Sequence, residues 1–257
     1  MKAIRADLPE NLDVAELHVL SDWHIGDKHS DADAINKKIT HIKDTPGAYA
    51  IVAGDVMDTA TTSSIGDTYE ANLTPMQQIE HAVKLLTPIK DKIIAIIPGN
   101  HEARVERSDG IETLRIVASQ LGLVEKYSNT TALCFVRVGK RNHGRKSRVC
   151  YVVYVTHGSG GGRKSGGKVN RLIDYCQIVD ADIYVAGHVH EPAVLRKSFF
   201  RPDSQHSTVS ITDKLFVSMA ATLDYGGYAD RQGYTPASKV SPVIYLDGRE
   251  KRAWAEI

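Results

Sequence analysis

The sequence lacks several features that would define a class of protein at once. Its longest aliphatic stretches, such as Ile93–Ile97, fall far short of the roughly 20 residues that cross a bilayer, which excludes a membrane-spanning helix. The formal net charge is only +1 at pH 7, which argues against attraction of the whole surface to nucleic acid or anionic lipid. Residues 1–13 have no continuous apolar core, so no signal peptide is expected.

Cysteine is also scarce, with only Cys134, Cys150 and Cys176 in the chain. An odd number of unclustered cysteines excludes a disulfide framework and a zinc knuckle, and it predicts reduced thiols in a cytoplasmic protein. Hydrophobic residues at 42% and charged residues at 25% are ordinary for a soluble globular chain. No internal repeat, long linker or low-complexity tract interrupts the 257 residues, so a single domain over residues 1–257 is predicted.

Short apolar runs alternate with amphipathic segments in the first part of the chain. Expected strands are residues 17–20, Ala48–Ala53 and Ile93–Ile97. Expected helices are residues 32–42 and Pro75–Leu86, each with apolar side chains at helical spacing. Strands that alternate with helices in this way predict a parallel or mixed sheet covered by helices.

The second part of the chain is richer in strands. Residues 131–138 and 148–156 are expected to form a hairpin, and residues 169–179 a helix. Four more strands are expected at Ile183–Ala186, 193–200, 215–218 and 243–246. The whole pattern predicts an α/β fold of two packed sheets with helices on the outside.

Polar side chains follow five of these strands at their carboxyl ends. The five segments read Ser-Asp-Trp-His from Ser21, Gly-Asp-Val-Met-Asp from Gly54, Gly-Asn-His-Glu from Gly99, His-Gly from His157 and Gly-His-Val-His from Gly187. One short motif of this kind is usually only loop chemistry. Open α/β sheets build their sites at the carboxyl ends of strands, so five such segments in a row are the pattern of a site.

The side chains in these segments offer oxygen and imidazole ligands and no sulfur, which suits Mn²⁺, Fe or Zn²⁺. They are Asp22, His24, Asp55, Asn100, His157, His188 and His190. Seven ligands are more than one tetrahedral ion needs, and they fit two ions about 3.5–4 Å apart that share a carboxylate. In a regular strand Asp22 and His24 would share a face, and His188 and His190 have the same spacing, so each pair is expected to converge as its strand ends.

Taken in order, the five segments resemble the motif set of the calcineurin-like metallophosphoesterases, and the resemblance extends from Asp22 to His190. It implies a β-sandwich flanked by helices, which agrees with the α/β pattern above. It also implies two divalent metal ions, manganese first, with iron, zinc, nickel or magnesium as alternatives. The implied reaction is hydrolysis of a phosphate ester by a metal-bound hydroxide that attacks phosphorus in line.

The resemblance further implies how the ligands are shared. One metal ion would be held by Asp22, His24 and His190. The other would be held by Asn100, His157 and His188, and Asp55 would bridge the two. His101 is similar to the family's catalytic histidine, which stabilises or protonates the departing oxygen, and Asp58 to the carboxylate that orients this histidine. The other histidines belong to no ligand motif, and packing or surface roles are expected for His18, His29, His41, His81, His143 and His206.

Two features bear on the type of ester. The opening Ser-Asp-Trp-His-Ile-Gly-Asp is similar to that of the repair-nuclease branch and its phage and bacterial stand-alone relatives. The protein phosphatases carry an Arg-Gly directly after the second Asp of Gly-Asp-x-x-Asp, whereas this chain has Thr59 and Ala60. A phosphodiesterase acting on nucleic acid or a nucleotide is therefore favoured. The alternatives are a phosphomonoesterase, including a protein phosphatase, and an inactive binding protein on the same fold.

A glycine-rich segment, residues 158–168, follows His157 and leads into an expected helix. Its backbone amides together with Arg163, Lys164 and Lys168 could cradle a phosphate chain, and a flexible connection that tolerates charge is the alternative. A second basic cluster, residues 140–148, is typical of a solvated hairpin tip. The expected partner is the ester substrate, with DNA or RNA included and no membrane. The oligomeric state stays open, and a dimer is one alternative.

Overall fold

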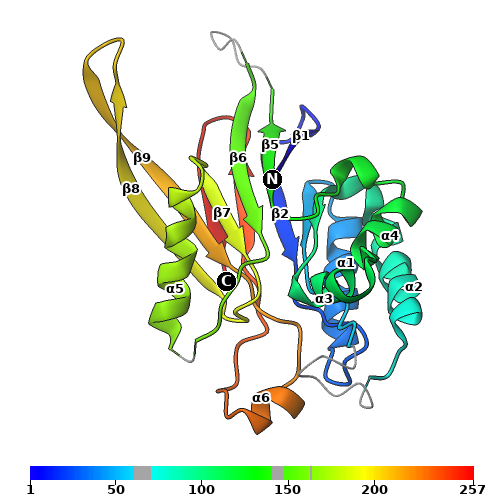
Figure 1. The fold of residues 1–257 in the computed structure, drawn as a ribbon. Helices are drawn as coiled ribbons and strands as arrows, with labels where there is room; N and C mark the ends of the chain where they lie inside the picture. Colours follow the sequence, from blue (N-terminus) through cyan, green and yellow to red (C-terminus); the bar gives the residue numbers. More distant parts are fainter. Residues whose placement is uncertain (61–70, 141–146, 163) are drawn as a thin grey trace.

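The computed structural model describes residues 1–60, 71–140, 147–162 and 164–257. Two β-sheets pack face to face, and helices cover their outer faces (Figure 1). This is the predicted α/β sandwich, so the expected fold class is confirmed. Within the described ranges, no helix has the length and apolar character needed to cross a membrane.

The five-stranded sheet has the order β11-β10-β2-β3-β4. Its strands are β2 (Val14–Leu20), β3 (Ala48–Ala53), β4 (Ile93–Ile97), β10 (Val243–Asp247) and β11 (Ala253–Glu256). The neighbours β2, β3 and β4 run parallel, whereas β10 is antiparallel to both β2 and β11. Because β2, β3 and β4 are parallel, their carboxyl ends lie at the same edge of the sheet.

Helices on this side are α1 (Ala32–Asp44), α2 (Pro75–Leu86), α3 (Asn100–Asp109) and α4 (Thr113–Gln120), with 3₁₀ turns at Thr87–Lys92 and Val124–Lys126. Local chemistry fixes where the first two begin. The side chain of Asp31 accepts a hydrogen bond from the Ala34 amide at the start of α1. At α2, Thr74 lies just before the helix and Gln77 in its first turn, and the two form a capping box. Pro75 is the first helical residue.

The six-stranded sheet has the order β1-β5-β6-β7-β9-β8. Its strands are β1 (Lys2–Asp7), β5 (Ala132–Val138), β6 (Val149–Thr156), β7 (Ile183–Ala186), β8 (Ala193–Asp203) and β9 (Thr208–Ser218). Helix α5 (Ser165–Asp174) and the 3₁₀ turn Tyr175–Gln177 follow β6, and the short α6 (Gly227–Arg231) follows β9. Strands β8 and β9 form a long hairpin that projects beyond the rest of the sheet (Figure 1).

The main core lies between the two sheets. Alternate residues of β5, such as Cys134 and Val136, are fully buried there against side chains such as Leu17 and Ile51 of the opposite sheet. A second apolar layer, which includes Leu20, lies between the five-stranded sheet and its helices. Strands β2, β3 and β4 are therefore covered on both faces, which fixes the positions of their ends.

Three sequence expectations need correction. The helix expected at residues 169–179 spans Ser165–Asp174, because the glycine-rich entry is already helical and the chain tightens into a 3₁₀ turn at Tyr175. The strands expected at 193–200 and 215–218 are each eleven residues long, Ala193–Asp203 and Thr208–Ser218. Their full length was not predicted, because their outer halves are exposed and lack an apolar pattern. Strand β1 was not expected, because its residues mix charged and apolar side chains.

Candidate metal centre

The predicted ligands lie at the rim of the sandwich where the two sheets meet. Asp22 and His24 follow β2, Asp55 follows β3, and Asn100 begins α3 just beyond β4. The opposite sheet supplies the three remaining histidines from the ends of β6 and β7. In Figure 1 the arrowheads of β2 and β6 point the same way, so the two sheets deliver their carboxyl ends to one region. The strand ends thus gather residues that lie far apart in sequence.

An unusual backbone aims these side chains. Asp22, His24, Asp55, His188 and His190 have φ angles of 55°, 48°, 49°, 69° and 54°. Non-glycine residues in this left-handed region cost roughly 1–3 kcal/mol each and concentrate at functional sites. The expectation that Asp22 and His24 converge as members of a regular strand is therefore wrong. They lie beyond β2, and left-handed turns bring them together instead.

Glycine permits the close approach of the loops. A Cβ atom on Gly99 would lie 2.1 Å from Oδ1 of Asp55, and one on Gly54 would lie 2.3 Å from the Gly99 nitrogen. Gly54 also has a φ of +85°. Any larger residue at either position would push the loops after β3 and β4 apart.

The first set of donors consists of Asp22, His24 and His190. Nε2 of His190 lies 3.2 Å from Oδ1 of Asp22 and 3.4 Å from Nε2 of His24. One donor atom from each residue lies within 4.8 Å of the others. A carboxylate and two imidazoles at these separations can close around one divalent ion.

The second set consists of Asp55, His157 and His188, with Asn100 between the histidines. Nε2 of His157 lies 3.1 Å from Oδ2 of Asp55. Oδ1 of Asn100 lies 3.0 Å from Nε2 of His157 and 2.7 Å from Nδ1 of His188. The carbonyl of Ala53 lies 2.8 Å from Nδ1 of His157 and so orients this ring from behind.

Electrostatics of the two sets favour bound cations. Asp22 and Asp55 are 0% and 1% exposed, and buried carboxylates require positive partners. Burial alone would raise the pKa of Asp55, but the charge and hydrogen bond of His157 outweigh it and lower the pKa. For His157, burial is likewise outweighed by Asp55, which raises its pKa to about 10. A metal ion would displace that proton, so the residues present fit divalent ions.

His101 faces this centre without belonging to either set. Its Nδ1 lies 3.0 Å from Oδ1 and 2.8 Å from the carbonyl oxygen of Asp58. Its Nε2 lies 3.8 Å from Oδ2 of Asp55. Burial would lower the pKa of His101, but the hydrogen bond that it donates to Asp58 and the charge of Asp55 raise it. Asp58 therefore lies where the sequence placed the orienting carboxylate.

Glu102 is a site residue for which the sequence analysis had no role. It is buried, and its Oε2 accepts hydrogen bonds from the amides of Asp55 (2.9 Å) and Gly99 (2.8 Å). Its Oε1 accepts one from the amide of Met57 at 3.0 Å. Glu102 thus ties the two loops that carry Asp55 and Asn100. A glutamate three residues after the glycine that precedes a helix was the available signal.

The predicted substrate-binding residues are less closely tied to the centre. Lys164 lies exposed at the start of α5, and Nζ of Lys168 forms an ion pair of 3.0 Å with Glu191, next to His190. Arg163 lies outside the described residues, as does most of the basic cluster at 140–148. The described Arg148 donates to the carbonyls of Gly139 (2.7 Å) and Leu8, which is a packing role.

A different cation lies next to His101. Nη2 of Arg104 donates to the carbonyl of Asp58 at 3.3 Å. Its buried Nε has no hydrogen-bond partner among the described residues. Arg107, one turn further along α3, is exposed. Of these two arginines, Arg104 is therefore the one beside the candidate centre.

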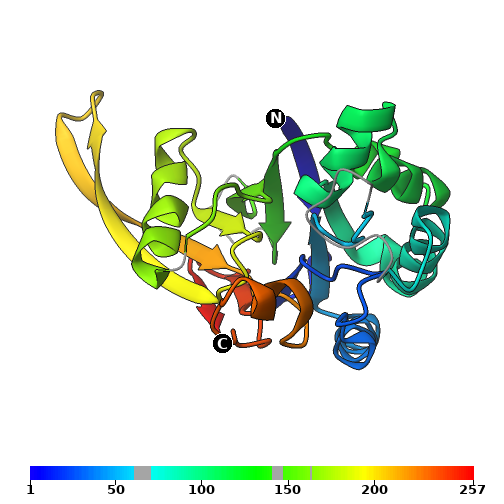
Figure 2. The ribbon, with the colours of Figure 1, turned by 60° about the horizontal axis from the view of Figure 1, so that its bottom comes forward.

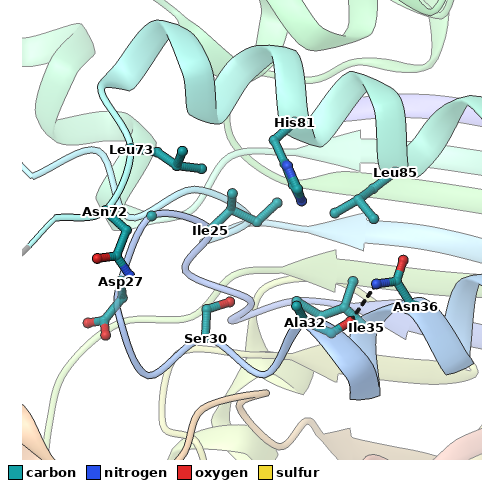
Figure 3. Close-up of a pocket in the computed structure, with 11 residues that line it drawn as sticks. Ile25, Asp27, Ser30, Ala32, Ile35, Asn36, Asn72, Leu73, His81 and Leu85 are labelled. Atoms are coloured by element: carbon teal, nitrogen blue, oxygen red, sulfur yellow. Dashed lines mark hydrogen bonds between the residues drawn. The ribbon is translucent and has the colours of Figure 1, made fainter.

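A small cavity adjoins the metal centre without forming part of it. Figure 3 shows it between α1, α2 and the loop after His24. Its volume is about 160 Å³. Ile25, Leu73 and Leu85 line it, and His81 points into it from α2. None of the predicted metal ligands lines this cavity, so we assign it no catalytic role.

Fold and site together define a phosphoesterase with donors for divalent ions. The family model of calcineurin-like phosphoesterases matches residues 17–192, and the chain belongs to this family. It is accordingly a metal-dependent phosphoesterase, and the expected family is confirmed. No curated protein matches the chain.

Solved structures with a similar fold include a conserved uncharacterised protein of Streptococcus pneumoniae TIGR4, a predicted phosphoesterase. It is 12% identical, with a TM-score of 0.39, over 95% of this chain and 90% of the other. Vps29 of Entamoeba histolytica, as a double mutant, is 12% identical with a TM-score of 0.43, over 90% of this chain and 85% of the other. Wild-type Vps29 of the same organism, complexed with zinc, is 10% identical with a TM-score of 0.37, over 94% and 97%.

Proposed function

We propose that this chain hydrolyses phosphodiesters, of nucleic acid or of nucleotides, at a centre holding two divalent ions, manganese first. The observation that carries the proposal is the juxtaposition of two donor sets with His101. Nε2 of His101 faces the donors, while Asp58 holds its Nδ1. A phosphate ester seated over the donors would therefore present its departing oxygen to an imidazole.

Bound divalent ions would neutralise charge on the phosphoryl oxygens and lower the pKa of water at the centre. Asp22, His24 and His190 would hold one ion, and Asn100, His157 and His188 the other, with Asp55 shared. His101 would donate a proton from Nε2 to the departing oxygen. Asp58 fixes the ring by accepting from Nδ1, and together with the charge of Asp55 it favours the imidazolium form of His101, in which Nε2 also carries a proton that can be transferred.

The residue after Asp58 supports a diester over a monoester. Thr59 is fully buried, and its hydroxyl donates to the carbonyl of His101 at 2.7 Å. This position therefore offers no guanidinium to a phosphoryl group. A monoester carries two negative charges near neutral pH and a diester carries one, so a site with fewer cations suits the diester.

A phosphomonoesterase remains the second candidate because of Arg104. Nη2 of its guanidinium donates a hydrogen bond to the carbonyl of Asp58, and its Nε has no hydrogen-bond partner among the described residues. Contact between this cation and a second phosphoryl oxygen would favour a dianionic substrate. The two candidates therefore differ in which charge state of the phosphate the site prefers.

A panel assay on the manganese-loaded chain separates the candidates. The substrates are bis-p-nitrophenyl phosphate, p-nitrophenyl phosphate, single-stranded DNA, RNA and cyclic nucleotides. We expect the diesters to show the higher kcat/KM, with two manganese ions per chain at saturation by elemental analysis. A higher kcat/KM for p-nitrophenyl phosphate would establish the monoesterase instead. No hydrolysis of any substrate, with both ions bound, would contradict the proposal.

A further inference from the structure

A third group of metal-ligating side chains lies away from the candidate centre. Glu16 and His18 are two residues apart on β2 and share its outer face, and His41 comes from the last turn of α1. Oε2 of Glu16 lies 3.0 Å from Nε2 of His18 and 2.8 Å from Nε2 of His41. We call Glu16, His18 and His41 the β2–α1 triad.

The triad has the same donor geometry as the two sets at the candidate centre. In all three groups the donor atoms lie within 4.8 Å of one another. The contacts of 3.0 and 2.8 Å between imidazole nitrogen and carboxylate oxygen compare with 3.2 and 3.1 Å in the two catalytic sets. Each group also combines one carboxylate with two histidines.

Burial differs across the triad in a way that suits a bound ion. The His18 side chain is 4% exposed, and its contact with Glu16 fixes the ring with Nε2 toward that carboxylate. Its Nδ1 has no hydrogen-bond partner among the described residues. The His41 side chain is 50% exposed, which leaves one side of the group open to water. Three fixed donors with an open fourth position is a common arrangement for zinc.

Charge around the triad is compatible with a cation. Burial is the main cause that lowers the pKa of His18, which keeps its imidazole neutral and its nitrogen lone pair available. Lys38, one turn before His41 on α1, is a cation whose charge also lowers the pKa of His18. Burial lowers the pKa of Lys38 to about 8, so it gives up its charge more readily than an exposed lysine.

We propose that Glu16, His18 and His41 bind a divalent transition-metal ion of the zinc, nickel or copper type, at a site separate from the candidate centre. Two imidazoles and one carboxylate favour these ions over magnesium or calcium, which prefer oxygen donors. Along β2, His18 lies about 7 Å before the end of the strand at Leu20, at roughly 3.3 Å per residue, and Asp22 lies in the loop beyond. A bound ion would join α1 to β2 and so stabilise the sandwich.

Zinc content of the full-length chain tests the proposal, with Asp55→Ala introduced to empty the catalytic centre. After dialysis against buffered zinc, Asp55→Ala is expected to retain one zinc ion, which the added change His41→Ala removes. Loss of a group that only hydrogen-bonds to a metal ligand weakens metal binding about 10- to 100-fold. Loss of a direct ligand should weaken zinc binding by at least that factor.

The control is His206→Ala, because among the described residues the exposed His206 contacts one carboxylate, that of Asp203 at 2.8 Å. This change should leave the zinc content unaltered. Zinc should raise the unfolding temperature of the Asp55→Ala chain, and His41→Ala should abolish that rise. Glu16→Gln, which keeps a hydrogen-bonding side chain, should act like His41→Ala and guards against a folding defect in one variant.

Equal zinc content in Asp55→Ala with and without His41→Ala would overturn the proposal and leave the triad as a hydrogen-bonded cluster. The outcome does not depend on hydrolysis of any ester. If the chain hydrolyses diesters but the triad takes no zinc, only the β2–α1 site fails. If zinc binds to the triad and no ester is hydrolysed, only the proposed function fails.

Discussion

The loops of the metal centre follow the ends of strands, whereas the β8–β9 hairpin consists of two paired strands, and the backbones of the two regions differ. The hairpin is paired without interruption from Ala193↔Ser218 to Asp203↔Thr208, and Ser207 is its one non-glycine residue with a positive φ. The loops place five predicted metal ligands in the left-handed region. Strained backbone is therefore concentrated where the predicted ligands converge, whereas the hairpin is a regular ladder with one such residue in its turn.

Side-chain burial follows the same division. Phe200 and Ile211 on the hairpin are 78% and 67% exposed and lie directly opposite each other. Asp22 and Asp55 in the loops are buried almost completely. Changes in the loops should therefore alter activity or stability strongly, whereas changes at exposed hairpin positions such as Phe200 and Ile211 should alter neither. The predictions below test the loop side of this contrast, beginning with the largest expected effect.

Asp55→Ala should remove metal and activity together. Asp55 contacts His157 of the second set, and its charge also acts on Asp22 and His24 of the first. We expect kcat/KM for a diester to fall by more than about 10⁴-fold, beyond the range of one acid–base group. Manganese content by elemental analysis is measured in parallel. Retention of both ions would show that Asp55 is not shared between them.

His101→Ala should lower turnover and leave the ions in place. His101 is oriented by Asp58 and belongs to neither set of predicted ligands. The expected loss in kcat is about 10²- to 10⁴-fold, the usual contribution of a general acid. Manganese content should equal that of the wild type. Loss of both ions would mean that His101 acts as a ligand and that the assigned role is incorrect.

Glu102→Ala should destabilise the fold at the loops. It would leave the amides of Asp55, Met57 and Gly99 without their buried acceptor. At about 1 kcal/mol or more for each unsatisfied group, the free energy of unfolding should fall by about 3 kcal/mol. Urea denaturation measures this. Glu102→Gln should also destabilise, because one amide NH₂ would face an N–H donor. Wild-type stability in both variants would refute the role of this carboxylate.

Neutralising Arg163, Lys164 and Lys168 together tests whether the segment after His157 contacts a polymer. We expect KM for an oligonucleotide to rise about tenfold, whereas KM for a small aryl diester changes little, because only the polymer presents flanking phosphates. The oligonucleotide reaction of the wild type should also weaken steeply with salt. An equal response of the two substrates would count against a nucleic-acid substrate.

Arg104→Gln, with Arg107→Gln as the matched control, separates a cation beside His101 from one on the exposed face of α3. Arg104 contacts Asp58, whereas Arg107 is exposed. We expect KM to rise several-fold for Arg104→Gln only, and more for p-nitrophenyl phosphate than for its diester. Steady-state kinetics on both esters measures this. Identical kinetics in the two variants would remove Arg104 from the substrate site.

Much of the fold was predictable because its core strands are short, apolar and bounded by polar residues. The bounds of Ala48–Ala53, Ile93–Ile97, Ile183–Ala186 and Pro75–Leu86 were predicted as the structure has them. Strand β1 was missed because a strand at the edge of a sheet needs few apolar residues. Helix α3 was missed because its side chains are mostly charged and only Glu102 and Val105 are buried.

For the site, sequence order identified the predicted ligands but not the way in which they converge. Left-handed φ angles at residues such as Asp22 and His188 depend on the surrounding packing and carry no clear sequence signal. The β2–α1 triad was missed for a related reason. Glu16 and His18 form no motif with His41, which comes from a helix 23 residues after His18 in the sequence. Only the packing of α1 on β2 brings the three together.

The pairing of β2 with β10 has a consequence for the order in which the chain folds. His18 lies opposite Val243, so β2 acquires this neighbour only after every strand from β3 to β9 has been synthesised. Until then the edge of β2, the strand that leads to Asp22, has unpaired backbone groups that could pair with another chain. Contacts this distant in sequence slow folding. The nascent chain should therefore be most prone to aggregation just before β10 is released.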